Sequence, residues 1–288
     1  MKKIFGGINL TWKKLIIFAI CSGIYTAVMA LIPALKYTSF HDITVSFEVW
    51  ILFGIIIISN SKSAKDSALK CFIYFLISQP IVYLIQVPFS SMRFEIFKYY
   101  SYWFIWTILT IPMGYIGYQI KKNKWWGMLI LVPILLFLGI HYYDYLKVMI
   151  YNFPYHLITI IFCIFTLLIY PIYLFDNKKL KIVGLSISII IIIVSTILAL
   201  SYNYSYKTSI LISGDSHNVI FDDSYKVYIK DKTLGNVYIE YEEDIEEYVI
   251  NAEFNKAGKT DLILENKNGD KTTFDLNVKI GSYEINVK

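Results

Sequence analysis

Long apolar runs recur through the first two thirds of this chain and constrain its fold more than any other feature. The clearest of them, residues 185–200, contains no charged residue. An α-helix needs about 20 mostly apolar residues to cross the hydrocarbon core of a bilayer. Stretches that approach this length occupy residues 15–35, 43–60, 70–89, 100–120, 126–143, 154–175 and 182–201. We therefore predict a membrane all-α helical bundle of about seven transmembrane helices.

Composition and charge agree with this prediction. Hydrophobic residues make up 56% of the chain and charged residues 17%, whereas a soluble domain is roughly 25% charged. Residues 201–288 contain 10 Lys and 16 Asp or Glu, a net charge of −6, and residues 1–200 have a net charge of +11. The basic residues stand at the ends of apolar runs and form no stripe on a folded face. The expected partner is thus the lipid bilayer and not nucleic acid.

The basic residues also predict an orientation. Alternate loops contain 13 lysines, at positions 2, 3, 13, 14, 62, 65, 70, 121, 122, 124, 178, 179 and 181. The remaining loops contain only Lys36, Arg93, Lys98 and Lys147. Lysine-rich loops stay on the cytoplasmic side of a membrane. We expect a multi-pass protein of the cell membrane with a cytoplasmic N-terminus and an extracellular C-terminal domain. Almost all the basic residues are lysines, and Arg93 is the single arginine. This preference is typical of the codon bias of an AT-rich bacterium.

After Leu200 the pattern changes to alternation of apolar and polar residues, which is typical of half-buried strands. Eight short strands are predicted, at residues 209–213, 218–221, 226–230, 236–241, 248–254, 261–265, 272–278 and 282–287. Asn268 and Gly269 suit the positive φ angles of a hairpin turn between two of them. The chain is therefore expected to have two domains, a transmembrane helical domain (residues 1–201) and a small all-β sandwich (residues 202–288).

Two segments of this β domain, residues 257–264 and 274–278, resemble the closing strands of bacterial immunoglobulin-like (Ig-like) surface modules. The resemblance consists of alternation and a turn glycine, and it is confined to these segments. It implies an Ig-like sandwich and no activity.

Two glutamines mark one face of the third predicted span. Gln79 and Gln86 lie seven residues apart, and Pro80 and Pro88 interrupt the backbone hydrogen bonding beside them. Such a face can line a ligand path, or it can form hydrogen bonds to a neighbouring helix. Glu48, near the outer end of the second predicted span, is a third candidate for the path. Its carboxylate can equally reach the headgroups or support helix packing.

Several ionisable residues fall at the predicted outer ends of the spans. Besides Glu48 these are His41, Asp42, His141, Asp144 and His156. Together they could bind Zn²⁺ or act as an acid–base pair, and they could also be ordinary solvated helix ends. Motifs such as H-E-x-x-H or G-x-S-x-G do not accompany them. The sequence therefore assigns no catalytic residue, metal site or cofactor.

In the β domain, exposed tyrosines are candidates for binding a partner. The four candidates are Tyr225, Tyr228, Tyr238 and Tyr241. Tyrosine is a frequent anchor of interfaces, although some of these side chains could fill the β core instead. An acidic run at residues 242–247 lacks the spacing of a calcium loop and suits a solvated strand edge.

Three functions remain open at this point. The leading hypothesis is a non-catalytic accessory, sensor or assembly component of the cell envelope. Its Ig-like domain would bind another envelope protein or a glycan. The second is a small-molecule transporter or channel that uses the Gln79 and Gln86 face. The third is an outer-leaflet enzyme that modifies a lipid or glycan, and no motif supports it.

Overall fold

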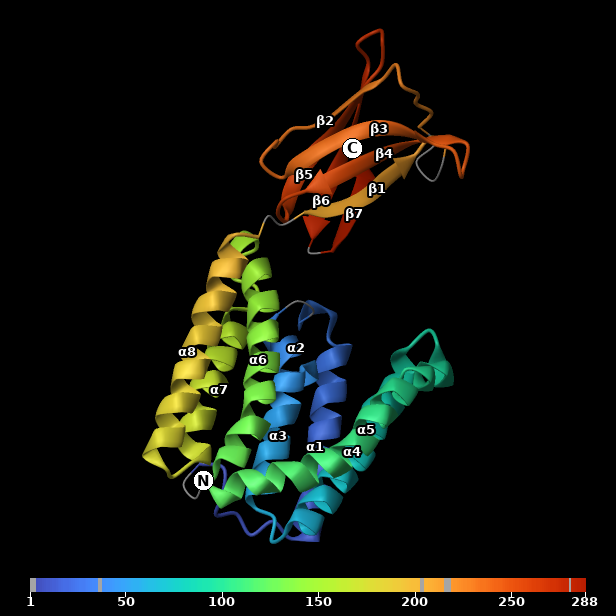
Figure 1. The fold of residues 1–288 in the computed structure, drawn as a ribbon. Helices are drawn as coiled ribbons and strands as arrows, with labels where there is room; N and C mark the ends of the chain where they lie inside the picture. Colours follow the sequence, from blue (N-terminus) through green and yellow to red (C-terminus); the bar gives the residue numbers. More distant parts are fainter. Residues whose placement is uncertain (1–3, 36–37, 203–204, 215–218, 280) are drawn as a thin grey trace. The chain divides into compact units, whose positions relative to one another are not determined.

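The computed structural model describes residues 4–35, 38–202, 205–214, 219–279 and 281–288. The chain forms two compact units (Figure 1). The helical unit comprises the chain up to Leu146 together with Tyr155–Ala199, and the β unit comprises Lys147–Pro154 and Leu200–Lys288.

Eight α-helices occur in the described residues. They are α1 (Trp12–Leu31), α2 (Ser39–Val45), α3 (Phe47–Ser59), α4 (Ala64–Gln86), α5 (Tyr100–Gly117), α6 (Trp125–Tyr151), α7 (Leu157–Leu174) and α8 (Lys178–Leu200). Short 3₁₀ helices lie between some of them: η1 (Pro33–Leu35), η2 (Val87–Phe89), η3 (Arg93–Lys98) and η4 (Tyr118–Lys122). Thr11 and Ser63 cap α1 and α4, each accepting a hydrogen bond from a first-turn backbone N–H.

Within the described parts of the chain, five helices are long and apolar enough to cross a membrane, namely α1, α4 continued by η2, α6, α7 and α8. They indicate a multi-pass membrane protein. The second predicted span, residues 43–60, is divided by extended backbone at Ser46 into the end of α2 and the 13-residue α3. A helix of that length rises only about 20 Å, less than the hydrocarbon thickness. The helix at the fourth predicted span, α5, is also not among the five. Seven crossings therefore stay a prediction.

Close packing brings α1, α4 and α5 into backbone contact. A Cβ atom added at Gly23 on α1 would lie 2.7 Å from the Ser78 carbonyl oxygen on α4. One added at Gly114 on α5 would lie 3.0 Å from the Ser67 carbonyl oxygen. The Ser67 hydroxyl also donates to the Gly114 carbonyl oxygen at 2.8 Å. Small residues allow such approach between membrane helices, where dispersion contacts replace the hydrophobic driving force.

Two clusters of buried side chains hold the helical unit together. One gathers α1, α3 and α4 around Leu15, Trp50, Ile57 and Tyr74. The other lies mainly among α6, α7 and α8, around residues such as Leu131, Leu135, Leu138, Leu167 and Tyr170. Since α3 contributes to both clusters, it joins the two groups of helices.

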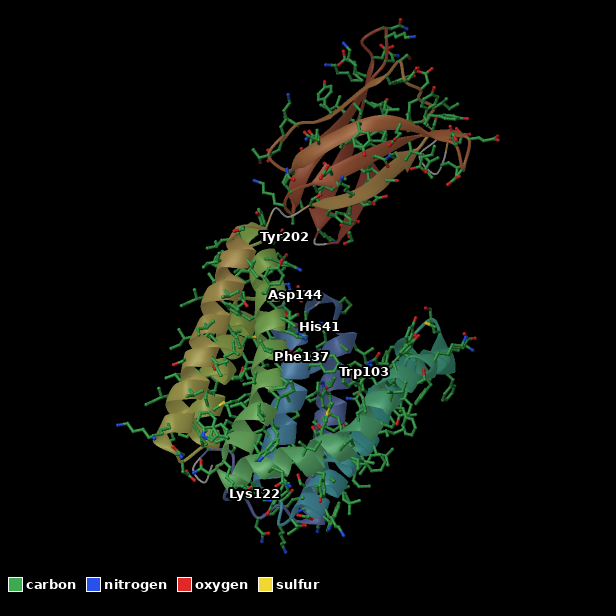
Figure 2. The ribbon with its side chains drawn as sticks, in the orientation of Figure 1. His41, Trp103, Lys122, Phe137, Asp144 and Tyr202 are labelled. Carbon is green, nitrogen blue, oxygen red and sulfur yellow. The ribbon has the colours of Figure 1, made fainter. Side chains whose placement is uncertain are left out.

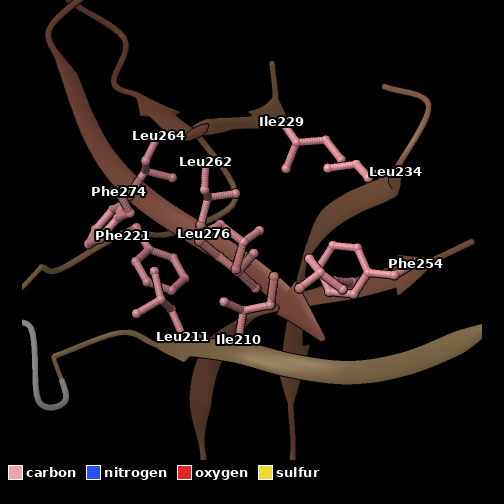
Figure 3. Close-up of a cluster of buried hydrophobic side chains, with 13 residues drawn as sticks. Ile210, Leu211, Phe221, Ile229, Leu234, Phe254, Leu262, Leu264, Phe274 and Leu276 are labelled. Atoms are coloured by element: carbon pink, nitrogen blue, oxygen red, sulfur yellow. The ribbon is translucent and has the colours of Figure 1, made fainter. Parts of the chain in front are cut away.

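The β unit contains seven strands in its described part. They are β1 (Tyr206–Ile212), β2 (Lys226–Ile229), β3 (Gly235–Glu242), β4 (Glu247–Phe254), β5 (Gly258–Glu265), β6 (Lys271–Lys279) and β7 (Ser282–Val287). One sheet has the order β1-β4-β3 and the other β2-β5-β6-β7, with antiparallel neighbours throughout. The two sheets share one core of 13 buried side chains (Figure 3). Alternation explains this core, because Leu262 and Leu264 on β5 face inward with Phe274 and Leu276 on β6.

The hairpin predicted around Asn268 and Gly269 is confirmed. It joins β5 and β6, Gly269 has a φ of 86°, and the Asn266 side chain accepts hydrogen bonds from the backbone of Asn268 and Asp270. The predicted strand 218–221 is wrong in its described part, 219–221, which is not a strand; Asn218 lies outside the described residues. Phe221 is instead held by Ser213, whose hydroxyl bonds both its N–H and its carbonyl.

The strand order differs from that of an Ig constant-type domain. There the first, second, fifth and fourth strands form one sheet, and the third, sixth and seventh form the other. Here strands 1, 4 and 3 face strands 2, 5, 6 and 7. The two-sheet antiparallel architecture is shown, and the Ig-like topology is not confirmed.

The glycine contact between α1 and α4 makes a testable prediction. Gly23→Val should lower the free energy of unfolding by about 1–3 kcal/mol, because the added atoms overlap the Ser78 carbonyl and force the helices apart. The matched control is Gly54→Val on α3, where an added Cβ would meet nothing within 4 Å. Thermal denaturation in detergent measures both variants. Equal stability of the two would contradict this account of the packing.

Candidate functional site

A cavity of about 220 Å³ lies in the helical unit. Five helices line it, with Thr26 and Ala30 from α1, His41 from α2, Trp50 from α3, Gln79, Val82, Tyr83 and Gln86 from α4, and Trp103 from α5. Figure 2 labels His41 and Trp103 on their helices. The structure thus brings both predicted glutamines together with His41, which was predicted as part of a different group.

The contribution of α4 follows from helical periodicity. Gln79, Val82, Tyr83 and Gln86 are separated by three, four and seven residues, so they lie on one face of the helix. Gln79 is only 5% exposed. Its side chain forms no hydrogen bond within the part of the chain that the structure describes. A carboxamide offers two N–H donors and a carbonyl acceptor, and buried polar groups are normally paired. The cavity therefore presents an unused hydrogen-bonding group.

The aromatic walls of the cavity are held by other rings. The ring centroid of Trp50 lies 5.5 Å from that of Phe75 and 6.2 Å from that of Tyr74. On the α5 side, the Trp103 ring lies 5.2 Å from the ring of Phe47. Such edge and tilted contacts stabilise aromatic clusters. Neighbouring rings therefore restrain the side chains of the cavity wall.

The short helix α2 is attached to the beginning of α7. The Ser39 hydroxyl accepts hydrogen bonds from the backbone N–H groups of Ile158 and Thr159, at 3.0 and 3.2 Å. One turn further along α2, Asp42 Oδ2 accepts from the Thr159 hydroxyl at 2.9 Å and lies 2.5 Å from His156 Nδ1. Both members of this ion pair are buried. Because Ser39 and Asp42 are anchored in this way, His41 between them is positioned at the cavity.

A second buried pair joins α3 to α6. Glu48 is fully buried, and its Oε1 lies 2.7 Å from His141 Nδ1. The ring of Tyr145 lies 6.3 Å from the ring of His141 and 5.2 Å from that of His156. The two histidine–carboxylate pairs are therefore neighbours, linked through Tyr145.

The predicted group of His and carboxylate residues is thus divided by the structure. Asp42 pairs with His156 and Glu48 with His141, whereas His41 lines the cavity and Asp144 is exposed. Among the described residues, no three His, Cys, Asp or Glu side chains are placed to share a metal ion. The arrangement consists of closed pairs that tie helices together.

The tyrosine candidates of the β unit also differ from one another. Tyr225 packs against the β core, and the Tyr228 hydroxyl lies at 3.4 Å from Glu265 Oε2. Tyr238 and Tyr241, in contrast, are 47% and 49% exposed. Both belong to β3, which is an edge strand of its sheet. Of the four candidates, these are the two with exposed side chains.

Some residues of the site were not predicted from the sequence. Val82 and Tyr83 could have been found, because they share the helical face of the two glutamines. Thr26, Trp50 and Trp103 belong to other helices, and no spacing relates them to Gln79. Ser39, Tyr145 and Thr159 were missed for the same reason.

Comparison with protein-family models, with curated proteins and with solved structures finds no match for this chain. The function is therefore argued from the site itself.

The attachment of α2 can be tested by removing one carboxylate. Asp42→Ala should lower the free energy of unfolding by roughly 1–3 kcal/mol, since it leaves the buried His156 and the Thr159 hydroxyl without their partner. The control Glu95→Ala removes a carboxylate from an exposed pair with Lys98 and should cost at most about 1 kcal/mol. Intrinsic tryptophan fluorescence during heating measures both. A smaller loss for Asp42→Ala would contradict the anchoring role.

Proposed function

We propose that this multi-pass membrane protein is a non-catalytic sensor or accessory component of the cell envelope. Its helical unit binds a small molecule in the cavity beside Gln79, and its β unit is displayed outside the cell. One observation carries the proposal, namely the carboxamide of Gln79, which lines an aromatic-walled cavity and has no hydrogen-bond partner among the described residues.

The position of the Gln79 carboxamide supports ligand binding. Its donors and acceptor line the cavity and are free to pair with a ligand. A ligand that pairs with Gln79 also fills space between side chains that neighbouring rings restrain. Cavities of this kind, mostly apolar with a few convergent polar groups, are the usual form of small-molecule sites.

The chemistry of the lining supports binding over catalysis. Among the lining residues that the structure describes, His41 is the single histidine, and Asp, Glu, Cys and Lys are absent. A catalytic histidine normally works with a second group that orients it or shares its proton. The carboxylates of Asp42 and Glu48 are engaged with His156 and His141, away from the lining.

The β unit supports an extracellular binding role. The excess of lysine in alternate loops favours a cytoplasmic N-terminus, and an odd number of crossings then exports the C-terminal unit. Tyr238 and Tyr241 on the edge strand β3 are the groups that we expect to contact an envelope protein or a glycan. An Ig-like character of this unit remains part of the proposal.

The same cavity also favours a second candidate, a small-molecule transporter or channel. Gln79 and Gln86 line one face of α4, which contains Pro80 and continues into the 3₁₀ helix η2, and helices with such irregular stretches often line the paths of transporters. Measuring ligand flux across a proteoliposome membrane distinguishes a sensor from a transporter, because a sensor binds its ligand without moving it across the membrane.

The proposal is tested with the purified full-length protein in nanodiscs and a library of small metabolites. A ligand at about 100 times its Kd should stabilise the protein by about 2.7 kcal/mol. Gln79→Leu should abolish most of this stabilisation, because leucine keeps the approximate size of glutamine and removes its hydrogen bonds. The matched control is Gln119→Leu in η4, outside the cavity. A library without any stabilising compound, or hits that bind both variants equally, would count against the proposal.

A further inference from the structure

The chemistry of the lining also defines a class of ligand. We propose that the cavity takes an uncharged, fused two-ring nitrogen heterocycle of the nucleobase type, bound through its hydrogen-bonding edges by Gln79 and Gln86. This inference rests on the proposed function, since it specifies the ligand of the same cavity.

The charge of the lining favours an uncharged ligand. Asp, Glu, Lys and Arg do not occur among the lining residues that the structure describes, and His41 is the single histidine there. Transfer of an ion from water into an apolar site is costly unless an opposite charge pairs with it. An ammonium ligand would have no anionic partner here, and a carboxylate or phosphate would have only the imidazole of His41.

The hydrogen-bonding groups of the lining favour a ligand with complementary edges. A glutamine carboxamide presents a donor and an acceptor side by side, and it pairs with a ligand edge that presents the complementary acceptor and donor. This geometry is the one by which Asn and Gln side chains bind the edge of adenine. A purely apolar ligand would displace water from the Gln79 amide without replacing its hydrogen bonds. Nitrogen heterocycles with amide-like or amidine-like edges supply these hydrogen bonds.

The size of the cavity and the spacing of the glutamines favour a fused bicycle. Gln79 and Gln86 lie seven residues apart on α4, which corresponds to about 10 Å along the helix axis. A fused bicycle offers hydrogen-bonding groups at opposite edges and reaches both side chains more readily than a single ring does. The cavity of about 220 Å³ is smaller than the sites of most drug-sized molecules and suits a compact metabolite.

The aromatic lining fits the same class. Trp50, Tyr83 and Trp103 contribute rings to the cavity, and neighbouring rings restrict the movement of Trp50 and Trp103. Flat heterocycles stack favourably on such side chains regardless of their exact substituents. Hydrogen bonds at the edges and ring contacts at the faces together describe a planar heterocycle.

The test uses the full-length protein in nanodiscs and measures quenching of the intrinsic fluorescence, since Trp50 and Trp103 line the cavity. Four probes are compared: adenine and hypoxanthine, which are neutral fused heterocycles, adenosine monophosphate, which is charged, and indene, which is a fused hydrocarbon without hydrogen-bonding groups. Adenine or hypoxanthine should quench saturably, with an affinity at least tenfold above those of the other two probes. Gln79→Leu should weaken this binding at least tenfold, and Gln119→Leu should leave it unchanged.

The outcomes separate this inference from the proposed function. Binding of indene in preference to the heterocycles would overturn the ligand class and leave a cavity that binds small molecules. Equal binding of adenosine monophosphate would overturn the argument from charge. If both heterocycles fail while a library compound of other chemistry passes the Gln79→Leu test, only this inference falls. If no compound passes either test, both fall. Unchanged thermal midpoints of the ligand-free variants show that each remains folded.

Discussion

The hydrogen bonds that attach α2 to the start of α7 are the interaction on which the candidate site depends. Ser39 and Asp42 satisfy two backbone N–H groups of α7, the Thr159 hydroxyl and the imidazole of His156. Without these contacts, the groups would have no hydrogen-bond partner at the start of the helix. Hydrogen bonds within the protein are most stabilising at such helix ends. Because α2 is so short, its position follows from these contacts, and with it the position of His41 at the cavity.

The rest of the cavity depends on how closely α1, α4 and α5 pack. Gly23 and Gly114 allow the backbones to meet, and the Tyr74 and Ser67 hydroxyls bond to the neighbouring helices. Beyond this tight region the same helices carry larger polar and aromatic side chains, of which Gln79 is one. The cavity is therefore bounded by rigid elements, a condition that favours a specific site over a loose gap.

The β unit shows which structural features local sequence patterns can predict and which they cannot. Alternating apolar residues predicted seven of its strands, and Asn268 with Gly269 predicted the hairpin between β5 and β6. The same patterns predicted a strand at residues 218–221, whereas the described residues 219–221 form no strand and the backbone of Phe221 is bound by the Ser213 hydroxyl. Local patterns did not predict the order of the strands, because β1 pairs with β4 and β2 pairs with β5 across long stretches of chain.

The sequence by itself determined the membrane character, the change to strands after Leu200 and the shared face of Gln79 and Gln86. Each of these follows from the spacing of side chains along one element, which helical and strand periodicity convert directly into faces. Only the tertiary structure decided that Asp42 meets His156 and that Trp50 and Trp103 join the glutamines at one cavity. These side chains come from different helices. Their proximity depends on how the helices pack against one another, which the spacing of residues along one helix does not determine.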